Sequence, residues 1–140
     1  MCSLHPASPG AAAFKRPWDV WTWDRPLGRT LSGLLGAGAL AAAGVLGGLV
    51  AWTFWVALLA PDVALFYDAR NAGPAQGQLS PRAARLYNVL HHPALALGLI
   101  ALGAATANQP LLVAGLGWFA HIALDRSLRF GPRRPDGRFH

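Results

Sequence analysis

Histidine and aspartate occur in three apolar parts of the chain, and these are side chains that bind metals or carry protons. Asp62 lies in one apolar segment, His91 in a second, and His121 and Asp125 in a third. Two imidazoles with one or two carboxylates suit a divalent metal such as zinc, iron or manganese. The same groups could instead hydrogen-bond to one another and lock helices together, or form a proton or ion path. All three interpretations stay open, and the candidate metal ligands are Asp62, His91, His121 and Asp125.

Helical spacing places the polar residues of each segment on a common face. His121 and Asp125 are four residues apart, and Asn88 is three or four residues from His91 or His92. The histidines and Asp62 also lie within eight residues of an arginine, which on a helix is ~8–12 Å from the charged end. We therefore expect one polar cluster at a common depth, formed by Asp62, Asn88, His91, His121, Asp125 and Arg126.

Two prolines adjoin this cluster. Pro61 precedes Asp62 and Pro93 follows His92. A proline inside a helix removes an amide donor and frees the carbonyl four residues earlier, so both helices should kink there. The kinks leave room for water, an ion or a lipid headgroup.

The segments that carry these residues have the composition of membrane spans. The chain is 54% hydrophobic and 13% charged, contains no glutamate, and from position 31 to 69 its only charges are Asp62 and Asp68. A span needs about 20 residues to cross ~30 Å of hydrocarbon, so this stretch predicts two spans with a break at Gly47-Gly48. The predicted fold is all-α, an integral membrane bundle of four transmembrane helices near 30–47, 51–69, 81–104 and 110–128.

The basic residues predict the orientation. All twelve Lys and Arg residues lie before the first span, in or beside the loop between the second and third spans, or at and beyond the end of the fourth, and the two hairpin turns carry none. By the positive-inside rule the protein is multi-pass in the inner (cytoplasmic) membrane with both termini cytoplasmic. The expected organisation is a flexible arm at 1–30, a transmembrane domain at 31–130 and a basic cytoplasmic tail at 131–140.

The net charge of +6 also bears on partners. Because the arginines sit between apolar segments, anionic lipid headgroups are the expected partner, and nucleic acid is not. The single cysteine, Cys2, excludes an internal disulfide and a zinc site built from several cysteines. The first span carries a stripe of small residues that predicts packing against a neighbouring helix of the same chain or, less simply, a homodimer seam: Gly33, Ala37, Ala41, Gly44 and Gly48.

Three segments, LLAPDVALFYD, LYNVLHH and GWFAHIALDRSLRFG, resemble the domain-of-unknown-function family 4260, small bacterial membrane proteins with the pattern PDxS, YNxxH and AHIxLDRxLGFG. The resemblance covers about residues 31–135, with Ala64 in place of the hydroxyl residue and Arg129 in place of a glycine. The matching residues are Pro61, Asp62, Tyr87, Asn88, His91, His121, Asp125, Arg126 and Gly131.

The resemblance implies the architecture and assigns no activity. The first hypothesis is a membrane protein with a polar His/Asp cluster near the cytoplasmic leaflet. A metal-dependent hydrolase is the first alternative, in which Arg126 steadies an anionic group of a lipid-like substrate. The second alternative is an ion or proton pathway in a dimer. Tyr67 and Tyr87 are interpreted as anchors at the membrane interface.

Overall fold

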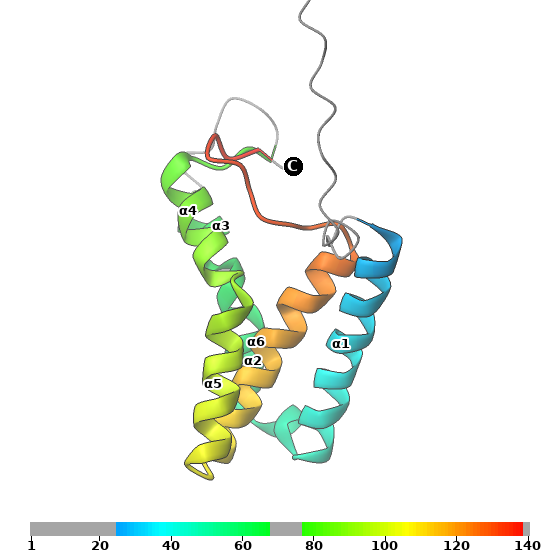
Figure 1. Cartoon of the computed structure of the whole chain (residues 1–140). Helices are drawn as coiled ribbons and strands as arrows, with labels where there is room; N and C mark the ends of the chain where they lie inside the picture. Colours follow the sequence, from blue (N-terminus) through cyan, green and yellow to red (C-terminus); the bar gives the residue numbers. More distant parts are fainter. Residues whose placement is uncertain (1–24, 68–76, 139–140) are drawn as a thin grey trace, which may run out of the picture.

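The computed structural model describes residues 25–67 and 77–138, which form four helical rods (Figure 1). The first and last rods are continuous, whereas the second and third are each divided in two. In chain order the elements are α1 (Pro26–Val45), η2 (Gly48–Val50), α2 (Trp52–Leu59), η3 (Ala60–Asp62), α3 (Val63–Tyr67), α4 (Pro81–Leu90), α5 (Pro93–Ala105) and α6 (Gln109–Ser127). The prediction of an all-α fold with four helices is confirmed for this part of the chain.

Helix α6 is the central element, because α1, α2 and α5 each pack against it. Two glycines allow its neighbours to come close. A Cβ on Gly115 would lie 2.7 Å from the Ile100 nitrogen of α5, and one on Gly117 would lie 2.7 Å from the Phe54 carbonyl oxygen of α2. Larger residues at these positions would push the helices apart, so these two glycines let α5 and α2 pack closely against α6.

The contact face of α1 differs from the predicted stripe. Ala37 and Ala41, which we expected at an interface, are exposed. The buried face is a neighbouring stripe of small residues with the same spacing: Gly28, Ser32, Gly36, Ala39 and Ala43. Helix α1 has small side chains on both faces, so composition did not distinguish them. A dimer seam stays a prediction.

Proline and polar caps define where the helices begin. The α4 helix starts as predicted at Ser80-Pro81, where Ser80 Oγ accepts a hydrogen bond from the Ala83 amide at 3.3 Å. The first hairpin turn also lies where we predicted it, with Gly47 in the left-handed conformation at φ 69°. Helix α1 begins at Pro26, earlier than expected, because proline is tolerated at a first helical position. Residues 26–30 of the predicted arm are therefore helical, and residues 1–24 lie outside the described residues.

Both predicted kinks are present, and one is a complete break. Pro61 lies in the 3-10 turn η3, which separates α2 from α3. We expected one kinked helix over 81–104, but α4 ends at Leu90 and α5 begins at Pro93. The residue before a proline avoids the helical conformation, and His92 is accordingly extended at φ −81° and ψ 121°. The Leu90 carbonyl at the end of α4 accepts a hydrogen bond from Trp118 Nε1 at 2.8 Å.

Helix α6 ends in a Schellman motif, which accounts for the glycine that the family pattern has at the position of Arg129. The Phe130 amide donates to the Asp125 carbonyl at 2.8 Å and the Arg129 amide donates to the Arg126 carbonyl at 3.3 Å. This pattern requires a left-handed residue between them, and Arg129 has φ 74°. Glycine, which the family pattern places here, adopts this conformation without a steric penalty.

Arg129→Gly should stabilise the protein by about 1 kcal/mol, the cost of a left-handed non-glycine residue. The arginine side chain is exposed, so little packing is lost. Thermal unfolding in detergent would measure the gain, with Arg134→Gly as an exposed arginine outside the motif. Lower stability of Arg129→Gly would mean that the side chain makes a stabilising contact.

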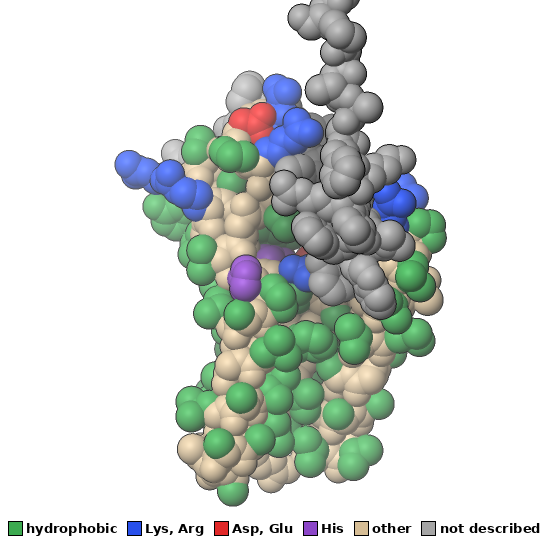
Figure 2. All heavy atoms as spheres, in the orientation of Figure 1, with side chains coloured by type: hydrophobic (Ala, Val, Ile, Leu, Met, Phe, Trp, Pro, Cys, Tyr) green, Lys and Arg blue, Asp and Glu red, His purple; other side chains and the backbone are tan. Residues whose placement is uncertain are grey.

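The surface separates into a basic end and an apolar remainder (Figure 2). Exposed hydrophobic side chains are large and numerous, including Val45 at 89%, Phe66 at 80% and Trp52 at 73% of their full exposure. Among the described residues, one helix meets the length and hydropathy of a membrane span, the combined rod Pro81–Ala105 of 25 residues with a mean hydropathy of 1.4. The apolar rod Trp52–Tyr67 is shorter.

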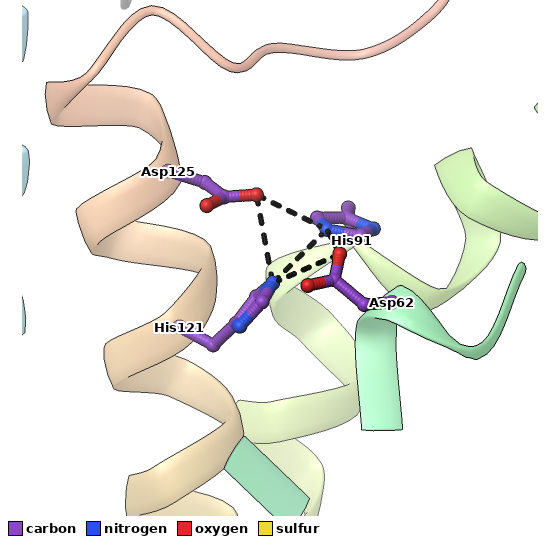
Figure 3. Close-up of side chains that lie close together, drawn as sticks. All are labelled: Asp62, His91, His121 and Asp125. Atoms are coloured by element: carbon purple, nitrogen blue, oxygen red, sulfur yellow. Dashed lines mark hydrogen bonds and ion pairs between the residues drawn. The ribbon is translucent and has the colours of Figure 1, made fainter. Parts of the chain in front are cut away.

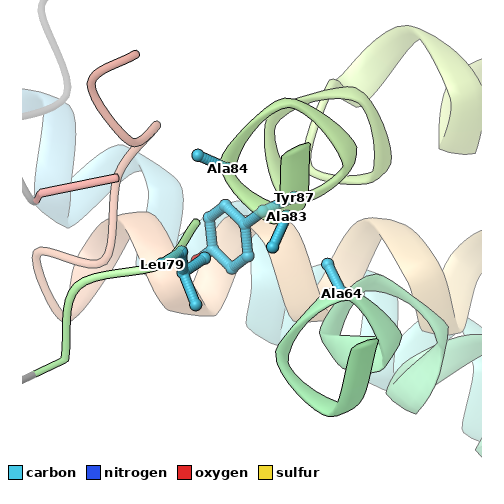
Figure 4. Close-up of a cluster of buried hydrophobic side chains, with 5 residues drawn as sticks. All are labelled: Ala64, Leu79, Ala83, Ala84 and Tyr87. Atoms are coloured by element: carbon cyan, nitrogen blue, oxygen red, sulfur yellow. The ribbon is translucent and has the colours of Figure 1, made fainter. Parts of the chain in front are cut away.

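The described part of the C-terminal region folds back onto the helices. It crosses from the end of α6 toward the start of α4 (Figure 1), where the Leu79 amide donates to the Gly137 carbonyl at 3.2 Å. Leu79 also belongs to a small buried cluster around Tyr87 (Figure 4), together with Ala64, Ala83 and Ala84. The tyrosine is 3% exposed. The interpretation of Tyr87 as an interfacial anchor is therefore wrong.

Candidate metal centre

Two histidines and two aspartates from three rods converge on one point (Figure 3). One donor atom from each of Asp62, His91, His121 and Asp125 lies within 4.8 Å of every other. The two histidine Nε2 atoms are 3.3 Å apart, and Asp125 Oδ2 lies 3.3 Å from that of His91 and 3.5 Å from that of His121. The expected His/Asp cluster is present, and the four side chains form a group that could hold a metal ion.

Each of these side chains is held at a helix break or on the central helix. Asp62 ends the η3 turn, His91 follows the last residue of α4, and His121 and Asp125 are one turn apart on α6. The second rod bends at Asp62 and the third is interrupted at His91. Both side chains therefore project toward α6 from a break in regular helix. The two proline breaks thus build the site as well as making room beside it.

Hydrogen bonds fix the His91 ring. Its Nδ1 lies 2.9 Å from the Tyr87 carbonyl oxygen, and a carbonyl can only accept, so Nδ1 carries the hydrogen. In the neutral imidazole the lone pair is then on Nε2, which faces the cluster. A second-sphere carbonyl of this kind is typical of histidine that binds metal.

His121 is oriented in the same way. Figure 3 shows one of its ring nitrogens pointing into the cluster and the other pointing away, so a neutral ring with its hydrogen on the outward nitrogen also turns a lone pair toward the cluster. Two imidazole lone pairs and two carboxylates then face one another. Acceptors at these distances repel unless a proton or a cation lies between them, and neutral histidines could not lock the helices by donating from Nε2.

The distances match tetrahedral coordination. A tetrahedral zinc with bonds of about 2.0–2.1 Å separates its ligand atoms by about 3.3 Å. The triangle formed by His91 Nε2, His121 Nε2 and Asp125 Oδ2 has sides of 3.3, 3.3 and 3.5 Å. These three atoms therefore fit one face of a tetrahedron.

Asp62 completes the fourth corner more loosely. Its Oδ1 lies 3.6 Å from His121 Nε2 and 3.8 Å from His91 Nε2. Its side chain is also the most exposed of the four, at 35% against 7% for His91. Asp62 is thus the ligand with the longest distances and the most access to solvent.

Tyr87 is a site residue that sequence reasoning assigned elsewhere. Its ring stacks on the His91 ring, with centroids 3.7 Å apart, and its hydroxyl donates to Asp125 Oδ2 at 3.4 Å. One tyrosine therefore contacts two of the four candidate ligands. The signal was its position four residues before His91, which places both on one helix face.

The remaining candidates have other partners. The Asn88 side chain bonds to the Arg133 backbone, outside the cluster. Arg126 lies beside the cluster, with Nη2 3.5 Å from the His91 carbonyl oxygen. His92 is exposed and caps α5, accepting from the Ala94 amide at 3.3 Å. Of the two adjacent histidines, only His91 belongs to the site.

Fold and site together define a small all-α protein with a His/Asp centre at the level of two helix breaks. The chain belongs to the family described as Domain of unknown function (DUF4260), whose sequence profile matches residues 31–139. No curated protein and no solved structure matches it. The family assignment confirms the resemblance and leaves the activity to be inferred from the site.

Proposed function

We propose that this protein is an integral membrane metalloprotein that holds a divalent metal, zinc by its geometry, near the cytoplasmic face. The convergence of two imidazoles and two carboxylates, three of them at tetrahedral distances, carries the proposal. Hydrocarbon makes unpaired ionisable groups expensive, so such a group marks either a functional site or a paired lock. The ring orientations favour the metal.

The surface supports the membrane location. Contiguous apolar surface beyond a few hundred Å² is unusual on a soluble monomer, whereas the helices here expose leucine, valine and aromatic side chains on their outer faces. Helix α6 has 19 residues and spans about 28 Å, close to the ~30 Å of a hydrocarbon core. All four helical rods would then cross the bilayer, including α1, whose glycine and alanine content lowers its hydropathy.

Arginine placement supports the orientation. The described arginines all lie at the end that holds the start of α1, the start of α4 and the end of α6, while the described hairpin turns have none. The positive-inside rule makes this end cytoplasmic, where anionic headgroups meet the arginines. His121 lies 12 residues from Gln109 and six from Ser127, so the site is nearer the cytoplasmic side.

The loose fourth ligand favours a catalytic centre over a purely structural one. Structural zinc sites have four firm protein ligands, whereas catalytic sites keep one position for water or substrate. The Asp62 side chain is 35% exposed and sits on a short 3-10 turn, so it can yield that position. A bound metal would supply Lewis acidity there, which suits hydrolysis of a substrate entering from the cytoplasmic leaflet. Arg126, beside His91, would hold an anionic group of that substrate.

Fractionation followed by metal analysis tests the proposal. The protein should sediment with membranes, stay there after alkaline carbonate, and contain about one zinc, iron or manganese ion per chain after detergent purification. Recovery in the soluble fraction would overturn the membrane location. Metal-free protein that also fails to bind added Zn²⁺, Fe²⁺ or Mn²⁺ would overturn the metal centre.

A further inference from the structure

The segment 133–138 makes several specific contacts with residues 77–88. The side-chain Nδ2 of Asn88 donates to the Arg133 backbone carbonyl at 2.8 Å, and its Oδ1 accepts from the Arg133 backbone amide at 2.7 Å. Gln78 adds a hydrogen bond to the Asp136 carbonyl at 2.7 Å. We call residues 133–138 the clasp, because they join the end of α6 to the start of α4.

Arg133 is the buried charged residue of the clasp. Its side chain is enclosed although it is charged, and the whole residue is 7% exposed. Its Nη1 donates to the Gly77 carbonyl at 2.6 Å and to the Gly137 carbonyl at 3.4 Å. A buried guanidinium is retained only where hydrogen bonds replace its water, so this position is a specific one.

Glycine is required for the clasp to close. Gly137 has φ 84°, which side chains rarely adopt, and a Cβ there would lie 1.8 Å from the Leu79 carbonyl oxygen. Any other residue at 137 would force the backbone away from Leu79. Gly137→Ala is therefore a way to open the clasp without changing a charge or an aromatic ring.

From the clasp, a chain of contacts leads to the metal ligands. The Arg133 guanidinium carbon lies 5.3 Å from the centroid of the Tyr87 ring, a cation–π contact. Tyr87 in turn stacks on His91 and donates to Asp125. Two adjacent residues of α4, Tyr87 and Asn88, thus contact Arg133 of the clasp.

We propose that the clasp is a positioning element that holds Tyr87, and through it the ligand His91, in the geometry that metal binding requires. This rests on the proposed metal centre. Second-sphere partners of metal ligands typically contribute 10- to 100-fold in metal affinity.

Metal affinity of clasp variants tests this role. Zn²⁺ competition with a chelator should show binding about 10- to 100-fold weaker for Gly137→Ala and for Arg133→Ala than for the wild type. The double variant should be no weaker than either single one, since both open the same segment. Arg134→Ala, an exposed neighbour, should bind as the wild type does. Absorption bands of the Co²⁺-loaded protein should shift in the first two variants alone.

The outcomes separate failure of the clasp from failure of the metal centre. Wild-type affinity and Co²⁺ bands in both Gly137→Ala and Arg133→Ala would overturn the clasp, as would an equal loss in Arg134→Ala. If the wild type binds no metal, the metal centre fails. Nitrogen NMR of the His91 ring then tests whether the clasp positions that ring. Nδ1 should then be protonated in the wild type and mixed between the two ring nitrogens in Gly137→Ala, and an unchanged ring would overturn the clasp.

Discussion

Alanine at His121 should remove stoichiometric metal from the purified protein. Metal binding by a four-ligand site is worth about 10–16 kcal/mol, so one ligand contributes about 2.5–4 kcal/mol, on the order of 100- to 1,000-fold in affinity. His91→Ala and Asp125→Ala should have the same effect, because these three donor atoms form the tight triangle of the site. Chelator competition with Zn²⁺ in detergent measures each affinity.

Asp62→Ala should be milder, about 10-fold, because its longer distances and greater exposure make it the weakest ligand. His92→Asn is the matched control. It removes the adjacent histidine and keeps a good N-cap for α5, so affinity should not change. Equal losses for Asp62→Ala and His121→Ala would show a closed structural site. A large loss for His92→Asn would mean that the wrong histidine has been assigned.

His91→Leu and His121→Leu should be strongly non-additive in their effect on the free energy of unfolding. With metal at 100 times its Kd, binding stabilises the folded state by about 2.7 kcal/mol. Either substitution loses that amount, and the double variant can lose it only once. The coupling should therefore be about 2.7 kcal/mol in loaded protein, measured by unfolding in detergent with and without the metal.

The metal-free protein gives the second half of this experiment. Without metal, a proton between the histidines and aspartates is what pairs these groups. Removing one histidine then leaves the other groups of the cluster without a partner in a low-dielectric site, which costs about 1–3 kcal/mol, and removing both histidines relieves part of that cost. The singles should thus again sum to more than the double. Losses that add within about 0.5 kcal/mol in both conditions would show that the two histidines do not share a site, and the metal centre would be abandoned.

Local signals in the sequence predicted most of the scaffold. The break at Gly47-Gly48, the start at Ser80-Pro81 and the bend at Pro61 depend on one turn of backbone, so each could be assigned without the rest of the fold. The four candidate ligands followed from similar reasoning. Helical rise gave their common depth, and the cost of charge in hydrocarbon gave the reason to expect that they meet.

Rotation of one helix against another was not available from the sequence. Helix α1 has small residues on two faces, and either could have packed against α6. The choice of His91 over His92 depended on where α4 ends, and the burial of Tyr87 depended on a segment more than 40 residues away. Periodicity specifies which residues share a face of a helix, but it does not specify which face packs against a neighbouring helix.

What the sequence determined by itself is therefore the four helical rods, the positions of their glycine and proline breaks, and the His and Asp residues that lie at one level. Only the tertiary structure decided that α6 is central, that Asn88 binds the backbone of Arg133, and that the Arg133 guanidinium lies over Tyr87. The physical reason is range. Helix signals act over three or four residues, whereas these contacts join segments whose approach is set by the packing of whole helices.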